Sequence, residues 1–579
     1  IYEGENIFSA QWFPQSKLNF AENMLKNRSD DEALIFRCED RISKTLSFAE
    51  LYNQVSKTAQ HLKELGVTKG DRVAGFLPNF AGSIVAMLAT ASVGAIWSSC
   101  SPDFGEQGVI DRFGQIEPKV LFCVDGYFYN GKTHNCLDKI KSFTARLPSL
   151  KQVVIFDYAS LSNIVINNSI SYQEILENYE AIEIGFERVG FDHPLYIMYS
   201  SGTTGVPKCI VHGHGGTLVQ HLKEHQLQTN ISSGDRVFYF TTCSWMMWNW
   251  LVSALGTGAT IMLYDGSPTY PDNTVLWQFA DEEEFSHFGT SAKYIEKLMK
   301  DDVNPSAIFK LSNLKVICST GSPLSAECYD YIYNNVGYVH LASISGGTDI
   351  VSCFVLGVPN IPVRRGEIQG AGLGMAVEIW DDSGRVNRGE RGELVCTKPF
   401  PSRPVKFWND IDGRKYHAAY FDRFEGVWAH GDFAEQTPDG GYIIYGRSDA
   451  TLNPGGVRIG TAEIYRQVDR VKEVLESIVI GQIWESDTRI VLFVKLREGI
   501  NLTETLADTI KKLIKNNCTS RHVPSKILQV EDIPRTKSGK IVEIPVRDIV
   551  HGREVKNKEA LANPEALDYF KDRPELALE

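Results

Sequence analysis

Residues 199–208, Tyr-Ser-Ser-Gly-Thr-Thr-Gly-Val-Pro-Lys, combine hydroxyls, two glycines and a lysine directly after an apolar stretch. Glycines permit backbone angles that other residues avoid, so successive amides can converge on one anion. Hydroxyl donors and a positive charge complete such an anion site. The segment therefore predicts a phosphate-binding loop with the donors Ser200, Ser201, Thr203, Thr204 and Lys208 and the glycines Gly202 and Gly205.

This segment differs from the common P-loop, which has four residues between its glycines and ends in Gly-Lys-Ser/Thr. Composition alone leaves a polar hairpin loop as the alternative. Motifs elsewhere in the chain must decide between the two interpretations.

Length and charge limit the possible functions. At 579 residues the chain exceeds one ordinary core, which predicts at least two domains, and its composition is that of a soluble globular protein. The net charge of -13 argues against a nucleic-acid partner held by a broad basic face, although a small basic pocket for a phosphorylated ligand is compatible with it. The 11 cysteines include no Cys-x-x-Cys pair, so we expect reduced, mostly buried thiols in a cytoplasmic protein.

Two uncharged stretches, residues 79–102 and 237–264, are long enough to cross a bilayer. Small and polar residues interrupt both, and Pro102 closes the first. We therefore expect helices and strands buried in a large core, and no membrane span.

Apolar runs bounded by turn signals alternate with helical patterns through about the first 400 residues, which indicates a layered α/β domain. The clearest case is a strand at 73–77 before Pro78-Asn79, followed by a buried helix from Ser83 to Ile96. The same strand, loop and helix order is predicted at residues 121–124, 152–156, 196–199 and 316–319.

Two further units follow this layered domain. From about residue 370 to 446, short strands and tight turns predict a small β-rich subdomain of the large domain, 1–448. Residues 449–579 are expected to form a small, mobile α+β domain. Its predicted elements are an amphipathic helix at 461–475, a strand at 490–496 and a helix at 501–515.

Five separated motifs together resemble the adenylate-forming superfamily, which includes acyl-CoA synthetases, the adenylation domains of peptide synthetases and luciferases. One such loop can arise by chance, but five in the superfamily's order and spacing identify the chain as a member. The resemblance runs from about Trp12 to the carboxyl terminus. The motifs are residues 199–208, Gly321-Ser322-Pro323, Gly346-Gly347-Thr348-Asp349, His430-Gly431-Asp432 with Gly446-Arg447-Ser448-Asp449, and residues 534–540.

Within the superfamily, the chain resembles short-chain acyl-CoA synthetases of the acetoacetate-activating branch. The segments that carry this narrower resemblance are residues 12–14, 18–23, 344–349, 397–402 and 446–460. It implies a ligase that activates acetoacetate with ATP as an acyl-adenylate and passes the acyl group to coenzyme A. The products would be acetoacetyl-CoA, AMP and pyrophosphate, and the implied partners are these small molecules with Mg²⁺.

The resemblance implies roles for the ATP-binding motifs. Thr203, Thr204 and Lys208, with the rest of their loop, would cradle the β- and γ-phosphates as pyrophosphate leaves. Gly321-Ser322-Pro323 would lie against adenine, where a glycine lets the backbone approach the base. A plain turn remains the alternative for that second motif.

Thr348 and Asp349 follow Gly347 in the third motif. By resemblance Thr348 would bind the α-phosphate, and Asp349 would hold a Mg²⁺ ion that bridges phosphate oxygens. The superfamily more often has Glu at this position, so the shorter carboxylate leaves room for a water beside the metal.

Asp432 would accept hydrogen bonds from both ribose hydroxyls, with Arg447 assisting, because a carboxylate can take two donors at once. His430 replaces the superfamily's more usual Thr. We expect it to be a core histidine and not a catalytic one.

Lys540 is implied to carry the adenylation chemistry. Attack of a carboxylate on the α-phosphate brings two anions together, and a lysine between them neutralises charge in the transition state. Asp449 falls at the superfamily's hinge, where rotation would withdraw Lys540 and bring Gly456 and Arg458 toward the acyl site. Arg458 also belongs to the implied ATP-binding set, and Gly455 with Gly456 would leave room for the pantetheine arm.

Coenzyme A phosphates would meet Lys132 and Arg521, although solvated surface cations are the simpler interpretation. In acetate-activating relatives a tryptophan near the third motif closes the acyl pocket, whereas here Gly346 leaves space for a longer acid. Trp245 and Trp248 would form an apolar wall in which Asn249 donates to a ketone oxygen. A segment of the hydrophobic core with no contact to the substrate is the alternative interpretation of this stretch.

Three other functions stay open at this level. The chain could activate another short acid such as propionate or butyrate, or be an adenylation module that loads a carrier protein. An inactive nucleotide-binding relative is disfavoured because Lys208, Asp349, Asp432 and Lys540 are all present.

Overall fold

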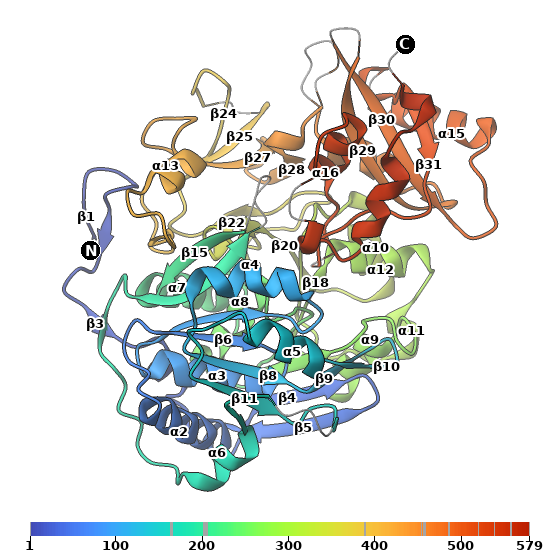
Figure 1. Ribbon diagram of the computed structural model, residues 1–579. Helices are drawn as coiled ribbons and strands as arrows, with labels where there is room; N and C mark the ends of the chain where they lie inside the picture. Colours follow the sequence, from blue (N-terminus) through green and yellow to red (C-terminus); the bar gives the residue numbers. More distant parts are fainter. Residues whose placement is uncertain are drawn as a thin grey trace.

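The computed structural model describes residues 2–161, 166–200, 207–386, 389–452, 454, 459–484, 487–518, 520–537, 539–555 and 558–577. Two large, mostly parallel sheets form the body of the protein (Figure 1). The eight-stranded sheet runs in the order β12 (Ser169–Ser171), β11 (Gln152–Phe156), β8 (Val120–Val124), β6 (Arg72–Phe76), β7 (Ile96–Cys100), β14 (Pro194–Ser200), β15 (Lys208–Gly213) and β26 (Lys406–Phe407).

The seven-stranded sheet runs in the order β20 (His340–Ser343), β19 (Val316–Thr320), β18 (His287–Ser291), β16 (Arg236–Tyr239), β17 (Thr260–Asp265), β4 (Glu32–Cys38) and β5 (Ile42–Ser47). The main helices of this part are α2 (Phe48–Glu64), α3 (Ala81–Ser92), α4 (Glu106–Ile116), α5 (Leu137–Thr144), α7 (His214–Lys223), α8 (Met246–Ser253), α9 (Val275–Glu282), α10 (Ala292–Lys300) and α12 (Ala326–Asn335).

Helix α3 explains the first uncharged stretch. Every residue of the helix from Gly82 to Ser92 is buried, in a core shared with strands of both large sheets. A helix covered on all sides has no need of a polar face. Among the described residues, no helix is long and apolar enough to cross a membrane.

The predicted strand before Pro78-Asn79 is confirmed as β6, but the helix predicted from Ser83 to Ile96 is shorter. It stops at Ser92, Gly94 turns the chain with a φ of +72°, and Ile96 opens β7. The helix predicted after residues 196–199 is wrong. Strand β14 instead pairs antiparallel with β15, with Ser200 opposite Lys208, so the predicted phosphate loop joins the two strands of a hairpin.

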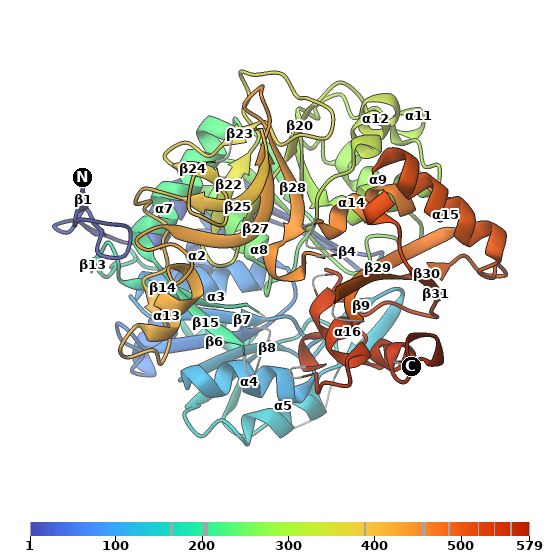
Figure 2. The same cartoon turned by 90° about the horizontal axis from the view of Figure 1, so that it is seen from above.

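The β-rich part is a four-stranded antiparallel sheet of β24 (Val377–Trp380), β25 (Arg391–Cys396), β27 (Trp428–Gln436) and β28 (Tyr442–Arg447). The C-terminal module follows it and has its own sheet of β29 (Val474–Trp484), β30 (Asp487–Leu496) and β31 (Lys526–Gln529), with α14 (Thr461–Val468), α15 (Glu504–Asn517) and α16 (Glu543–Val550). Figure 2 shows this module, in orange and red, beside strands β27 and β28.

Two hydrophobic clusters lie wholly within the module, one on each side of its sheet strands, so it has a core of its own. The predicted class, a layered α/β domain with a small α+β domain, is confirmed. The helix predicted at 461–475 ends earlier, at Val468, because Leu475 already lies in β29. The boundary at residues 448 and 449 stays a prediction.

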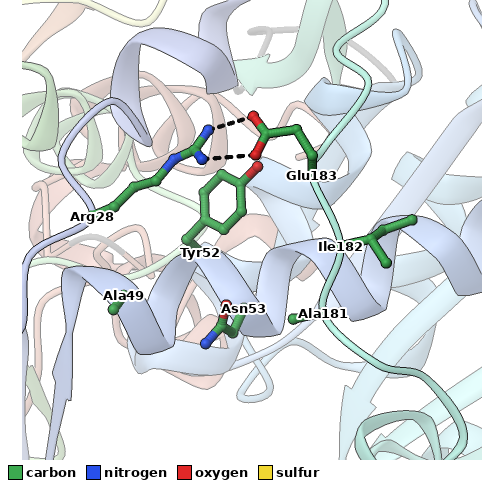
Figure 3. A pocket seen from close by; sticks show the side chains of 7 residues that line it. All are labelled: Arg28, Ala49, Tyr52, Asn53, Ala181, Ile182 and Glu183. Atoms are coloured by element: carbon green, nitrogen blue, oxygen red, sulfur yellow. Dashed lines mark hydrogen bonds and ion pairs between the residues drawn. The ribbon is translucent and has the colours of Figure 1, made fainter.

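An extended segment, residues 179–188, is fastened to α2 by side chains. The Tyr52 hydroxyl accepts from the Ile184 amide at 2.8 Å, and Ser56 exchanges two hydrogen bonds with the Ile182 backbone. Arg28 and Glu183 form a bidentate ion pair, and the Arg28 guanidinium lies over the Tyr52 ring (Figure 3). They line a surface cavity of about 300 Å³ that contains none of the site residues predicted from the sequence.

Asp265, the last residue of β17, is a largely buried acid. The Tyr158 hydroxyl donates to its Oδ2 atom at 2.8 Å, and the Cys38 sulfur lies 3.9 Å from the same oxygen. Burial raises the pKa of Asp265 to about 7, although the hydrogen bond from Tyr158 opposes the shift. The folded protein therefore keeps a proton on this carboxyl that the unfolded chain loses near pH 4.

We expect Asp265→Asn to make thermal stability less dependent on pH. Because the folded-state pKa is raised, the stability that the wild-type carboxyl contributes is complete below pH 4 and is lost as pH rises through about 7. The amide cannot ionise, so the stability of the variant relative to the wild type should rise by about 1–3 kcal/mol between pH 5 and pH 8. Calorimetric melting at pH 5, 6, 7 and 8 measures this difference, and parallel curves for the two proteins would contradict it.

Candidate active site

The carboxyl ends of parallel strands β18, β19 and β20 share one edge of the seven-stranded sheet. Gly321, directly after β19, has a φ of +93°, a conformation that favours glycine. A β-carbon there would lie 3.6 Å from the Trp245 ring. Trp245, a residue predicted to line the acyl pocket, is half-buried. It therefore lies against the predicted adenine segment and not in the interior of the core.

The turn that bears Thr348 and Asp349 lies between β21 (Ser345–Gly347) and β22 (Ser352–Leu356). Gly346 pairs with Cys353, and a β-carbon on Gly346 would lie 2.0 Å from the Ser352 carbonyl oxygen. Close backbone packing therefore requires a glycine at this position, whatever the size of the acyl group.

Asp349 is partly exposed, and the Tyr420 hydroxyl donates to its Oδ1 atom at 2.5 Å. Tyr420 ends α13 (Arg414–Tyr420) and stacks on the Trp428 ring at 3.8 Å. Burial raises the pKa of Asp349, but the charge environment of His430, the Tyr420 hydrogen bond, Lys208 and Arg447 outweighs burial and lowers it overall. The carboxylate is ionised at neutral pH.

Asp432 and Arg447 face each other across strands β27 and β28. The guanidinium Nη1 atom lies 3.1 Å from Asp432 Oδ1 and 3.1 Å from the His430 carbonyl oxygen. Gly431 has a φ of +84°, and a β-carbon there would lie 2.5 Å from the guanidinium. The glycine between His430 and Asp432 therefore makes room for the arginine.

His430 is buried and packs edge-on against Phe354 at 4.7 Å, with its Nε2 atom 3.8 Å from Asp432 Oδ2. Burial lowers the pKa of His430. The ring is therefore neutral at pH 7, in keeping with the expected core histidine.

Lys540 extends from a tight turn in which Gly539 has a φ of +80°. The turn is closed by the Thr536 amide, which donates to the Lys540 carbonyl at 2.7 Å, and by the Lys540 amide, which donates to the Thr536 hydroxyl at 3.0 Å. The side chain keeps solvent access, yet the charges that act on it are Asp432, Arg447 and Asp349. Surrounding protein atoms lower the pKa of Lys540, and the two carboxylates oppose that shift.

The C-terminal module is docked on the large domain at two places. On one side Lys537 donates to the Asp103 carbonyl at 3.0 Å and lies 4.2 Å from the centre of the Phe104 ring. On another side Asp469 meets two lysines of α10, with Lys293 at 3.8 Å and Lys300 at 3.9 Å. Glu296 of the same helix bonds both lysines, at 2.6 and 2.7 Å.

Asp449, at the predicted hinge, lies in a 3₁₀ turn, Ser448–Ala450, between the two parts. Its carboxylate lies 3.7 Å from Arg447 of the large domain, and its carbonyl accepts from Arg547 of α16 at 3.2 Å. The residue therefore contacts both sides of the expected rotation.

Other predicted residues are separate from this group or fall outside the description. Lys132 is exposed at the start of β10 (Lys132–Asn135), and Arg521 lies in a 3₁₀ helix, Ser520–His522, of the C-terminal module. Trp248 is completely buried, and the Asn249 amide faces the Met198 sulfur at 3.7 Å. Residues that lie outside the described part of the chain are Ser201, Gly202, Thr203, Thr204, Gly205, Gly455, Gly456 and Arg458.

Sequence reasoning missed several residues that hold the site. Tyr420 and Lys537 are examples, and His212 is another, since its Nε2 atom lies 2.8 Å from the Thr348 carbonyl oxygen. Each sits in a different element from the residue it contacts. Only Lys537 lies within one of the five motifs, so the others carried no signal in the sequence.

Comparisons with known proteins identify the family. The AMP-binding enzyme family matches residues 20–403, and the AMP-binding enzyme C-terminal domain matches residues 464–540. An acetoacetyl-coenzyme A synthetase of Rhizobium meliloti is 58% identical over 579 residues, which is all of this chain and 89% of the relative. An acetoacetyl-CoA synthetase of Gallus gallus is 47% identical over 98% of this chain and 87% of the relative.

A solved structure is also similar. The acetoacetyl-CoA synthetase from Streptomyces lividans superimposes with a TM-score of 0.94 at 42% identity, covering 99% of this chain and 88% of that one. The chain therefore belongs to the AMP-binding enzyme family and, within it, to the acetoacetyl-CoA synthetases.

Proposed function

We propose that this protein is an acid:thiol ligase that converts acetoacetate, ATP and coenzyme A into acetoacetyl-CoA, AMP and pyrophosphate. The observation that carries the proposal is the docking of the C-terminal module through Lys537 and Asp469, which leaves Lys540 within the electrostatic influence of Asp349 and Asp432 of the large domain. The names of the similar proteins suggest acetoacetate as the acid.

In the first half-reaction an acetoacetate oxygen attacks the α-phosphorus, and the bond to the bridging oxygen breaks, so that its electron pair leaves with pyrophosphate. Both reactants are anions, and their approach is opposed by charge repulsion. The Lys540 ammonium would stabilise the negative charge that gathers in this transition state. Lys208 and the loop before it would hold the departing phosphates.

Asp349 is suited to a magnesium site that the substrate completes. Its carboxylate is ionised and partly exposed, and the described residues include no cluster of three or more ligating side chains. Phosphate oxygens and waters would then supply the other ligands, as is usual for Mg²⁺. The ion, when bound, neutralises phosphate charge, and Tyr420 fixes the carboxylate that holds it.

Asp432 would accept the ribose hydroxyls, since Arg447 holds the carboxylate in place at 3.1 Å. Gly321, Ser322 and Pro323 would cover the adenine, with Thr348 and Gly347 near the α-phosphate. Trp245, Trp248, Asn249 and Gly346 are proposed to surround the acyl group.

In the second half-reaction the coenzyme A sulfur loses its proton, attacks the acyl carbon and displaces AMP. Lys540 has no role in this step and would leave by rotation at Asp449, which requires the contacts of Asp469 with α10 to break. Rotation would bring Gly455, Gly456 and Arg458 forward, and Lys132 with Arg521 would meet the coenzyme A phosphates. A cytoplasmic location fits the 11 cysteines, all of them free thiols and ten of them buried.

Lys540→Ala should reduce adenylate formation by about 100- to 1,000-fold, because it removes one fixed charge from the transition state. Thioester formation from supplied acetoacetyl-adenylate should stay within about threefold of the wild type, since that step uses another domain pose. Acid-dependent exchange of labelled pyrophosphate into ATP measures the first step, and release of AMP measures the second. Equal losses in both steps would refute the division of labour.

The acid preference can be measured directly. With a panel of acetate, propionate, butyrate and acetoacetate, kcat/KM should be highest for acetoacetate. Butyrate differs from it only at the ketone, so a lower value for butyrate would reflect recognition of that oxygen. A higher value for butyrate would overturn the assignment of the acid, and failure of free coenzyme A to discharge the adenylate would favour a carrier-protein acceptor.

The decrease of the adenylation rate at high pH, the alkaline limb of its pH profile, should reflect deprotonation of Lys540. Its pKa is lowered, so the charged form that the reaction needs is lost as pH rises through a value below that of an ordinary lysine. Lys540→Arg keeps the charge at all these pH values and should lose the limb, at a lower maximal rate. Pyrophosphate exchange between pH 7 and 10 provides the comparison, and identical limbs in both proteins would exclude Lys540 as the titrating group.

A further inference from the structure

The segment from β15 to the π-helix Glu224–Gln228 lies against the turn that carries Thr348 and Asp349. Besides His212, which donates to the Thr348 carbonyl, His221 donates from Nε2 to the Val351 carbonyl at 2.6 Å. Burial lowers the pKa of both histidines, to about 4 for His212. Both rings are therefore neutral, and the carbonyl acceptors place the proton on Nε2.

The turn needs such support because its backbone is strained. Val351 has a φ of +48°, which is rare for a β-branched residue. A conformation of this kind persists only where surrounding contacts hold it, and it is often found at functional sites. The hydrogen bond from His221 is one of those contacts.

Glu224 supplies a second support from the same segment. Its side chain is completely buried, and Oε1 accepts from the Ser352 hydroxyl at 2.5 Å and the Cys353 amide at 3.2 Å. Oε2 accepts from the Trp250 indole at 3.0 Å. The carboxyl group therefore has hydrogen-bond donors on both oxygens, and the Lys223 Nζ atom lies 3.8 Å from Oε1.

These contacts join two parts of the proposed site. Ser352 and Cys353 lie opposite Gly347 and Gly346 in the paired strands, and Thr348 and Asp349 directly follow Gly347. Trp250 belongs to α8, the helix that also carries the proposed acyl wall. The Glu224 carboxylate therefore accepts a hydrogen bond from the helix of the proposed acyl pocket at Oε2. At Oε1 it accepts hydrogen bonds from the strand beside the proposed phosphate-binding turn.

Resting on the proposed function, we propose that Glu224 is a positioning residue that couples the fit of the acid to the placement of Asp349. An acid that displaces α8 pulls on Trp250 and, through the shared carboxylate, on the strand that orients the turn. Glu224 itself contacts neither substrate, and the route of coupling is the chain Trp250, Glu224, Ser352.

Glu224→Gln tests this coupling, because the amide keeps the shape but presents N–H groups to partners that are themselves donors. One readout is binding: the additional rise in melting temperature when Mg²⁺ accompanies ATP, with no acid present. We expect the variant to lose at least half of that increment. The other readout is the acetoacetate-to-butyrate ratio of kcat/KM, which should fall at least threefold.

Asp235→Asn is the matched control. Asp235 is also a buried carboxylate, but it bonds Lys315 at 2.8 Å and Ser232 at 2.9 Å, at the start of β16. Its loss should lower the melting temperature and leave both readouts as in the wild type. Unchanged readouts in Glu224→Gln, or equal changes in the two variants, would overturn the proposal.

If Glu224→Gln does not fold, Ser352→Ala, Trp250→Phe and their double variant decide the question, because each single change removes one donor to a different oxygen of Glu224. The measured quantity is again the acetoacetate-to-butyrate ratio of kcat/KM. We expect the change of this ratio in the double variant to differ at least threefold from the product of the changes in the two single variants. Equality of the two would overturn the coupling. A failure of the proposed function can be told apart from a failure of the coupling. If the function is wrong, the wild type shows no acetoacetate-dependent pyrophosphate exchange, whereas the additional rise in melting temperature with Mg²⁺ still tests the role of Glu224.

Discussion

The ion-pair cluster of Lys293, Glu296 and Lys300 with Asp469 is the contact on which the proposed chemistry depends. It joins α10 to the C-terminal module and, together with the contact of Lys537 with Asp103, keeps Lys540 where the charges of Asp432 and Asp349 act on it. Two lysines and two carboxylates balance in charge, which makes their partial burial tolerable. The contacts to Asp469 are long, 3.8 and 3.9 Å, as the proposed rotation of the C-terminal module would require.

The large domain holds its site residues through close packing. The Asp349 turn is packed so closely that a side chain on Gly346 would collide with the Ser352 carbonyl, and Gly431 is needed for Arg447 to reach Asp432. Glycines at these two places allow charged groups to meet at short distance. In the proposed reaction such preorganised charges do not have to rearrange as the transition state forms.

Two aspartates show how the fold assigns different charges to one residue type. Burial pushes the pKa of both Asp265 and Asp349 upward. At Asp349 a histidine, a tyrosine hydroxyl and two cationic side chains reverse the shift, whereas Asp265 has further acids nearby and retains a pKa of about 7. Asp349 is therefore an anion, as the proposed cation site requires, and Asp265 acts as a neutral hydrogen-bonding group in the folded protein at mildly acidic pH.

The sequence by itself determined the fold class, the family and the motif residues, because local patterns set strands and turns and because the five motifs keep their order. It correctly placed β6, the β-rich part and the separate core of the C-terminal module, but it overran the ends of α3 and α14 and expected a helix where β15 pairs with β14. Apolar periodicity does not show where one buried element gives way to the next. Only the tertiary structure decided that Tyr420 holds Asp349, that Glu224 joins Trp250 to Ser352 and that Asp469 docks on α10. These contacts join residues that lie from 26 to 176 positions apart, and no local pattern records which distant side chains will meet.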